Sequence, residues 1–231
     1  MNVINLDNLK GLPEKYLIQL DKFKCVFLRS DFLEDLENES HIQNLITEIN
    51  NYCFENLIIG YHYTKAVVED ILEKGLLIRS GSEIRNCFIK KYGSMFTQKE
   101  IEFIKNAWES YFSLKQKKIR DNLIYFNFTQ NALNNGCAEE LLNFYGGEQV
   151  HMPFQEIKGI KEKLSSIGFS LILKCRLSPR DLFTETENPW GKIAVSTYHN
   201  KQNPNAFRKD IDGYQFIPVS AKNIEINYIN T

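Results

Sequence analysis

The sequence predicts an α+β protein, with helices concentrated in the first half of the chain and strands dominating the second. Two observations predict this class. Apolar residues recur at helical spacing behind capping signals in residues 40–52 and 97–121. Short β-rich runs separated by turn signals follow from residue 122 onward. The chain has 231 residues, of which 43% are hydrophobic, and no repeat or linker, so we expect a single domain over residues 1–231.

The first part of the chain predicts a helical extension over residues 1–55. Within it, "KCVFLRS" at residues 24–30 is typical of a short strand. The segment 40–52 predicts an amphipathic helix that Ser40 and Gln43 would open as a capping box. The remaining residues, 56–231, form the predicted core.

The core opens with "ENLIIGYHYT" at residues 55–64, a short apolar and aromatic run that predicts a buried strand. Thr64 is expected to cap the helix that follows, and Gly75 to end it. Residues 76–80, "LLIRS", then resume an extended pattern. A long helix over residues 97–119, with Thr97 and Glu100 as its capping box, is predicted as an insertion in this core.

The second half of the chain predicts the remaining elements. The segment "PFQEIKGIKEKLSSIG" is typical of a short helix. The expected strands are the β-rich runs at residues 122–130, 169–178, 191–199 and 213–220.

Composition excludes several classes of protein. The formal net charge of −1 provides no basic field for coating nucleic acid or a membrane surface. The five cysteines are scattered and never form a CxxC pair, which predicts reduced thiols and no metal site. No apolar run approaches the roughly 20 residues that span a bilayer, and the start of the chain has no signal-peptide pattern. We therefore expect a cytoplasmic protein without a metal or a membrane partner.

Four segments resemble, in order, the ADP-ribosyltransferase fold of poly-ADP-ribose polymerases and related small bacterial toxins. They are "GYHYTKAVVEDILEKGLLI", "NLIYFNFTQNALNN", "GFSLILKCRLSPRDLF" and "DGYQFIPVSAKNIEINYI", which together cover most of residues 57–229. The resemblance implies a split central β-sheet with helical additions at the N-terminus and in the middle. It also implies NAD as the substrate.

The resemblance assigns His62 to a ribose hydroxyl and Tyr125 to the family's tyrosine, with Thr64 supporting the histidine strand. Cleaving the nicotinamide–ribose bond requires held hydroxyls, an aromatic face and a negative charge near the developing cation. Aromatic side chains supply such faces. The expected NAD contacts are therefore Tyr61, Tyr63, Thr64, Phe126, Tyr145, Gly146 and Gly147.

The sequence departs from the family at the catalytic glutamate, where Gln215 stands. A carboxylate lost at about 4 Å from a cation forfeits roughly 4 kcal/mol of attraction at an effective dielectric near 20. Asp210, Asp212 and Glu148 are alternative acids. We favour Glu148, because the glycines of "YGGE" allow close backbone approach to a ligand and Tyr145 precedes them.

The expected function is an enzyme that cleaves NAD and passes ADP-ribose to a protein, a nucleic acid or water. The family resemblance implies a bacterial toxin or an anti-phage defence effector, with an inhibitor or antitoxin protein as a partner. The alternative is a catalytically weak or inactive module that binds NAD, ADP-ribose, a related nucleotide or a partner protein. A related RNA 2′-phosphotransferase is disfavoured because the arginines that its site pairs are dispersed here.

Overall fold

The computed structural model describes residues 1–37, 39–154 and 157–229. Contacts within the chain divide it into two compact units. Unit 1 comprises Met1–Tyr61, Tyr125–Asn135 and Lys174–Tyr214. Unit 2 comprises His62–Ile124, Gly136–Leu173 and Gln215–Thr231. Both contain helices and strands, in agreement with the predicted α+β class.

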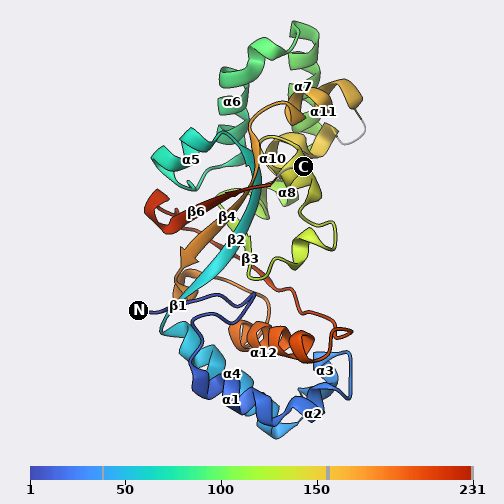
Figure 1. Cartoon of the computed structure of the whole chain (residues 1–231). Helices are drawn as coiled ribbons and strands as arrows, with labels where there is room; N and C mark the ends of the chain where they lie inside the picture. The colour runs from blue at the N-terminus through green and yellow to red at the C-terminus, as the bar shows by residue number, and fades with distance from the viewer. Residues whose placement is uncertain (38, 155–156, 230–231) are drawn as a thin grey trace. The chain divides into compact units, whose positions relative to one another are not determined.

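The strands of the described residues form one sheet in the order β5-β3-β2-β4-β6, with β1 beside β2 (Figure 1). The β1–β2 pair is parallel, and the β2–β3 pair is antiparallel with Tyr61 opposite Asn127. The predicted strands around residues 55–64, 122–130 and 169–178 are confirmed. The strands are β1 (Val3–Ile4), β2 (Leu57–Ala66), β3 (Ile124–Asn127), β4 (Phe169–Leu177), β5 (Asp212–Gln215) and β6 (Ile224–Tyr228).

Unit 1 is built around the packing of helix α4 on helix α12, which lie close together in Figure 1. Gly191 permits this approach, because a Cβ atom there would lie 1.9 Å from the Ile46 carbonyl oxygen. Trp190 is 1% exposed and packs edge-on against Phe128, with the ring centroids 4.7 Å apart. The helices of this unit are α1 (Glu14–Lys22), α2 (Lys24–Phe27), α3 (Leu33–Leu36), α4 (Ser40–Phe54) and α12 (Pro189–Gln202), with 3-10 turns η2 (Asn131–Leu133) and η4 (Pro179–Asp181).

Two predicted strands of unit 1 are wrong. Residues 24–30 contain helix α2, which follows α1 directly and buries Phe27 against the rings of Tyr198 and His199. Residues 191–199 lie inside α12. This helix is buried along its whole first part, so its sequence lacks the one-sided apolar period of a surface helix. Its β-branched residues therefore give the local sequence pattern of a strand.

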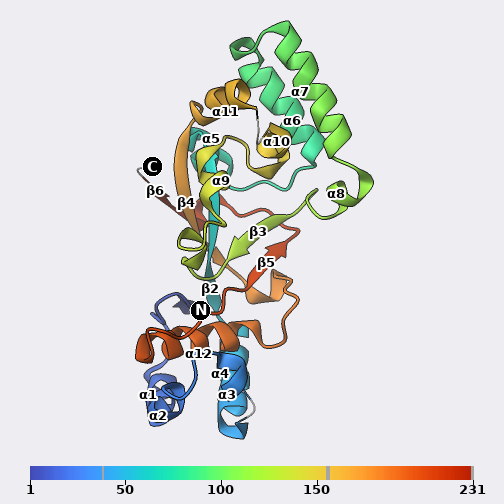
Figure 2. The ribbon, with the colours of Figure 1, turned by 90° about the vertical axis from the view of Figure 1, so that its right-hand side faces the viewer.

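Unit 2 has a separate hydrophobic core that α6, α7, α10 and α11 share. Helices α6 and α7 run side by side (Figure 2), and Phe88 of α6 meets Trp108 of α7 with ring centroids 5.9 Å apart. The helices of this unit are α5 (Val68–Lys74), α6 (Gly81–Tyr92), α7 (Gln98–Tyr111), α8 (Leu114–Lys118), α9 (Glu139–Asn143), α10 (Glu148–His151) and α11 (Lys158–Ser165), with 3-10 turns η1 (Gly93–Met95), η3 (Met152–Phe154) and η5 (Ala221–Asn223).

The capping box of Thr97 and Glu100 is confirmed, but the predicted single helix 97–119 is interrupted. Phe112 leaves helical geometry with ψ 72°, and the Ser113 side chain then caps α8. Gly75 ends α5 with φ 69°, as predicted. That positive φ explains why glycine stands there.

Three other local predictions are wrong. Thr64 lies within β2, and α5 begins later with Val67 at its N-cap and no side-chain cap. Ser40 is the first residue of α4, where its side chain makes no cap. Residues 76–80 form no strand beyond a single bridge from Leu76 to Val219. The helix prediction over residues 153–168 is confirmed by α11, although residues 155–156 lie outside the described residues.

Within the ranges described above, every helix is too short or too polar to cross a membrane.

Candidate functional site

Strand β2 carries four of the predicted site residues on alternating faces. His62 and Thr64 are half-buried and share one face, because side chains alternate along a strand. Tyr61 and Tyr63 are buried on the opposite face. The Tyr61 hydroxyl donates to the Asn5 side-chain oxygen at 3.1 Å within unit 1. Burial, followed by the charge of Asp7, raises the pKa of Tyr61 to about 12.

A glycine turn lies beside the end of β2 within unit 2. Tyr145 pairs with Lys65 in a parallel bridge, and the Gly146 amide donates to the Lys65 carbonyl at 3.3 Å. Gly146 has φ 83°, and a Cβ atom there would lie 2.4 Å from the Val150 side chain. Only glycine fits such a position. The turn is therefore held against the strand that carries His62, three residues before Lys65.

Glu148 begins α10 directly after this turn. The Arg120 Nε atom donates to Glu148 Oε2 at 2.8 Å. The Glu148 side chain is 46% exposed and that of Arg120 is 16% exposed, so the carboxylate faces solvent while its partner is largely covered. Arg120 thus fixes the direction of the Glu148 carboxylate.

His151 stabilises the turn through a hydrogen bond to its backbone. Its Nδ1 atom lies 2.9 Å from the Gly147 carbonyl oxygen, and because a carbonyl only accepts, Nδ1 carries the hydrogen. Its Nε2 atom lies 3.4 Å from Glu140 Oε2. Burial lowers the pKa of His151 and outweighs the opposing effect of Glu140. Sequence reasoning did not assign His151 this role.

Tyr145 packs into the unit 2 core rather than standing alone. Its ring meets Tyr92 edge-on, with centroids 4.9 Å apart, and lies 6.0 Å from Phe88. Burial, followed by a hydrogen bond with the Tyr92 hydroxyl, raises the pKa of Tyr145 well above its usual range. The phenol therefore stays protonated at neutral pH.

Tyr125 and Phe126 occupy opposite faces of β3. Tyr125 is 40% exposed, and its ring lies 5.3 Å from that of Tyr214. Tyr214 in turn stacks on Phe183 at 5.7 Å. Phe126 is buried in the core of unit 1 next to Gly60. The two aromatic residues predicted from one motif therefore face different surroundings.

Gln215 ends β5 and is 2% exposed. Its Nε2 atom donates to the Ile217 carbonyl at 2.7 Å, so the side-chain amide closes a local turn. Asp212 is exposed and lies on the opposite face of the strand, as the alternation predicts. Gln215 is thus a buried, neutral side chain with a hydrogen bond inside its own turn.

Asp210, the other acid considered from the sequence, is partly covered within unit 1. The Thr129 hydroxyl donates to Asp210 Oδ1 at 3.1 Å. Burial raises the pKa of Asp210 above its ordinary value of 3.8, despite lowering contributions from Thr129, Asn127 and Arg208. Asp212 adds a smaller raising effect.

Asp210→Asn is expected to stabilise the protein at neutral pH. A raised pKa means that the folded state binds the Asp210 proton more tightly than the unfolded state does. The stabilising contribution of this acid is therefore complete below about pH 3.8 and is lost as the pH rises through the folded pKa. Urea unfolding of wild type and variant across this range should give a difference that grows toward neutral pH. Exposed Asp181→Asn is the control, and an equal, pH-independent shift in both variants would contradict the assignment.

The structure brings the glycine turn, Glu148 and the end of β2 together in unit 2. It also assigns Gln215 to that unit, while Tyr61, Tyr125 and Phe126 belong to unit 1. Arg120 is a site residue that the sequence did not reveal, because a pair 28 residues apart has no local signature. No group of three or more His, Cys, Asp or Glu side chains in residues 1–37, 39–154 and 157–229 is arranged to hold a metal ion.

Comparison of the chain with models of known protein families, with curated proteins and with solved structures gives no match.

Proposed function

We propose that the protein cleaves the nicotinamide–ribose bond of NAD and transfers ADP-ribose to a macromolecule or to water. The observation that carries this proposal is the docking of the glycine turn on β2 in unit 2. The Gly146 amide bonds to the Lys65 carbonyl, so Glu148 follows a turn that is attached to the His62 strand.

The roles follow from the chemistry of the reaction. His62 would hydrogen-bond a ribose hydroxyl, and the Glu148 carboxylate would face the oxocarbenium-like charge that develops as nicotinamide leaves. Arg120 acts as a positioning residue, since its 2.8 Å bond orients Glu148. No role at this site is proposed for Tyr125, which belongs to unit 1.

The proposed setting is a cytoplasmic toxin or anti-phage effector of a bacterium, with an inhibitor or antitoxin protein as its partner. In this setting the acceptor is a protein, a nucleic acid or water. NAD is a substrate, and the proposed chemistry uses no metal.

A second candidate function is a module that binds NAD, ADP-ribose, a related nucleotide or a partner protein without turnover. Gln215 favours it, because the amide is buried and bonded to the Ile217 carbonyl. The neutral amide supplies no negative charge, and its nitrogen already donates to a backbone carbonyl.

His62→Ala is expected to lower nicotinamide release from NAD by about tenfold to a hundredfold. The loss corresponds to roughly 1.4–2.8 kcal/mol, the range for a hydrogen bond to the reacting substrate. Chromatography of nicotinamide after incubation with NAD measures the rate, and His41→Ala on an exposed helix residue is the control. If wild type binds NAD without releasing nicotinamide, the enzyme hypothesis is rejected and the binding module is supported. If wild type neither binds nor cleaves NAD, the enzyme and an NAD-binding module are both excluded.

A further inference from the structure

A cavity lies wholly within unit 2 and is lined by residues that the proposed NAD chemistry does not use. Its volume is about 430 Å³, within the usual range of small-molecule sites. It opens between α6 and α7 and reaches α8. The residues that define its character are Arg85, Lys105, Trp108, Glu109, Phe112 and Lys117.

Arg85 is the fixed centre of this cavity and is only 8% exposed. Its guanidinium carbon lies 4.2 Å from the centroid of the Phe112 ring. Its Nη1 atom donates to Gln149 Oε1 at 2.8 Å. Gln149 Nε2 donates to Asp121 Oδ1 at 3.0 Å, and Asp121 also accepts from the Gly81 amide. The guanidinium is therefore held by the Phe112 ring and by the Gln149 amide, which is itself bonded to Asp121.

The charge of Arg85 has no direct counter-ion. Among the residues that the structure describes, no carboxylate forms an ion pair with Arg85, and its hydrogen-bond acceptor is the neutral amide of Gln149. Burial accordingly lowers the pKa of Arg85, and Asp121 only partly opposes this. Burying a cation without an anion is costly, so this arrangement points to a ligand that brings the negative charge.

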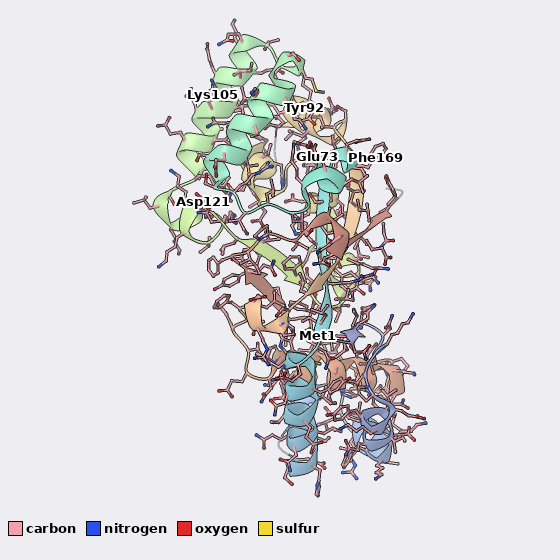
Figure 3. All side chains as sticks on the ribbon, turned by 90° about the vertical axis from the view of Figure 1, so that its left-hand side faces the viewer. Met1, Glu73, Tyr92, Lys105, Asp121 and Phe169 are labelled. Atoms are coloured by element: carbon pink, nitrogen blue, oxygen red, sulfur yellow. The ribbon has the colours of Figure 1, made fainter. Side chains whose placement is uncertain are left out.

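The rim of the cavity continues the positive charge. Lys105 on α7, labelled in Figure 3, and Lys117 on α8 are exposed and line the opening. Glu109 is the acidic lining residue, one helical turn beyond Lys105. Trp108 provides an apolar wall, and its indole nitrogen is already bonded to the Val150 carbonyl at 3.0 Å. The charged lining thus consists of three cations and one carboxylate, beside an apolar wall.

We propose that this cavity binds a small phosphate ester that also carries hydroxyl groups, such as a nucleoside monophosphate or a sugar phosphate. The phosphate is held by the Arg85 guanidinium, whose planar donors match phosphate oxygens, and by the two rim lysines. A hydroxyl of the ligand donates to the Glu109 carboxylate. A single cation-lined site of this volume suits one phosphate and one ring better than an extended strand.

The test is isothermal titration of the full chain with 5′-AMP, ribose 5-phosphate and inorganic phosphate in turn. We expect 5′-AMP or ribose 5-phosphate to bind more tightly than inorganic phosphate. Lys105→Gln and Lys117→Gln should each weaken this binding about fivefold to tenfold, and both effects should shrink at high salt. Arg85→Lys keeps the charge but loses the planar pair of guanidinium donors, and it should weaken ligand binding about tenfold or more.

Lys99→Gln on α7 and Lys118→Gln on α8 are matched controls, since neither residue lines the cavity. They should bind like wild type. The proposal is overturned if none of the three probes binds, or if the rim and control variants weaken binding equally. His62→Ala should leave 5′-AMP binding unchanged. Loss of binding in His62→Ala but not in Lys105→Gln would place the ligand at the proposed NAD site instead.

Discussion

Glu148→Gln is expected to lower nicotinamide release from NAD by about a thousandfold. The substitution keeps the size of the side chain and removes its charge. A carboxylate about 4 Å from the developing cation contributes roughly 4 kcal/mol at an effective dielectric near 20. Glu148 is the acid whose direction is fixed, because Arg120 Nε bonds its Oε2 at 2.8 Å. The rate of nicotinamide release at saturating NAD measures this loss.

Two further variants separate this role from alternatives. Exposed Glu139→Gln on α9 is the control for removing a nearby acid and should leave the rate unchanged. Gln215→Glu introduces the carboxylate that the sequence resemblance implies at this position. If Glu148→Gln retains the wild-type rate while Gln215→Glu raises it strongly, the acid of the site belongs at residue 215 and the Glu148 assignment is wrong.

Trp190→Ala is expected to destabilise the protein by about 3–5 kcal/mol, a large part of the roughly 5–15 kcal/mol typical of a folded domain. Trp190 is 1% exposed, lies against Phe128 and sits at the start of α12. Its backbone amide donates to the Asn50 side chain of α4 at 3.2 Å. Removing the indole leaves a cavity where these two helices meet. Urea unfolding followed by circular dichroism measures the change.

Trp190→Phe is the matched control for this prediction. The Trp190 indole nitrogen is buried and has no hydrogen-bond partner among the residues that the structure describes. Phenylalanine removes that unsatisfied donor and keeps most of the apolar volume, so it should cost much less than alanine. Equal losses for the two variants, or a loss below about 1 kcal/mol for alanine, would contradict the packing described for unit 1.

The sequence predicted the elements that have strong local signals. Thr97 and Glu100 form the expected capping box of α7, and Gly75 ends α5. The apolar runs that became β2, β3 and β4 were also recognisable. Helix α6 was missed although it carries such a signal, since Ser80 and Glu83 form a complete capping box at its start. The pattern Ser/Thr-x-x-Glu would therefore have predicted the start of this helix as well.

Helix α12 was missed for a physical reason. Its residues from Pro189 to His199 are nearly all buried, so no polar face marks the helical period. Its Ile, Val and Thr residues favour strands locally, but packing against α4 decides the conformation. Propensity is a weak guide where tertiary contacts surround an element.

The candidate site was predictable only in part. His62 and the glycine turn stand out in the sequence as a strand-end histidine and a "YGGE" motif. The Arg120–Glu148 pair and the Arg85–Gln149 bond join residues 28 and 64 positions apart, and no local pattern encodes such pairs. The hydrogen bond from the Gln215 amide to the Ile217 carbonyl was likewise visible only in the structure.

The central claim is that this chain cleaves NAD, and the most direct measurement is a time course of wild-type protein with NAD. Chromatography should detect free nicotinamide, together with an equal amount of ADP-ribose that is either free or attached to an acceptor. We expect nicotinamide to accumulate with time and with protein concentration, and His62→Ala to suppress it. Binding of intact NAD without any nicotinamide release, from a protein shown to be folded, would contradict the enzymatic account.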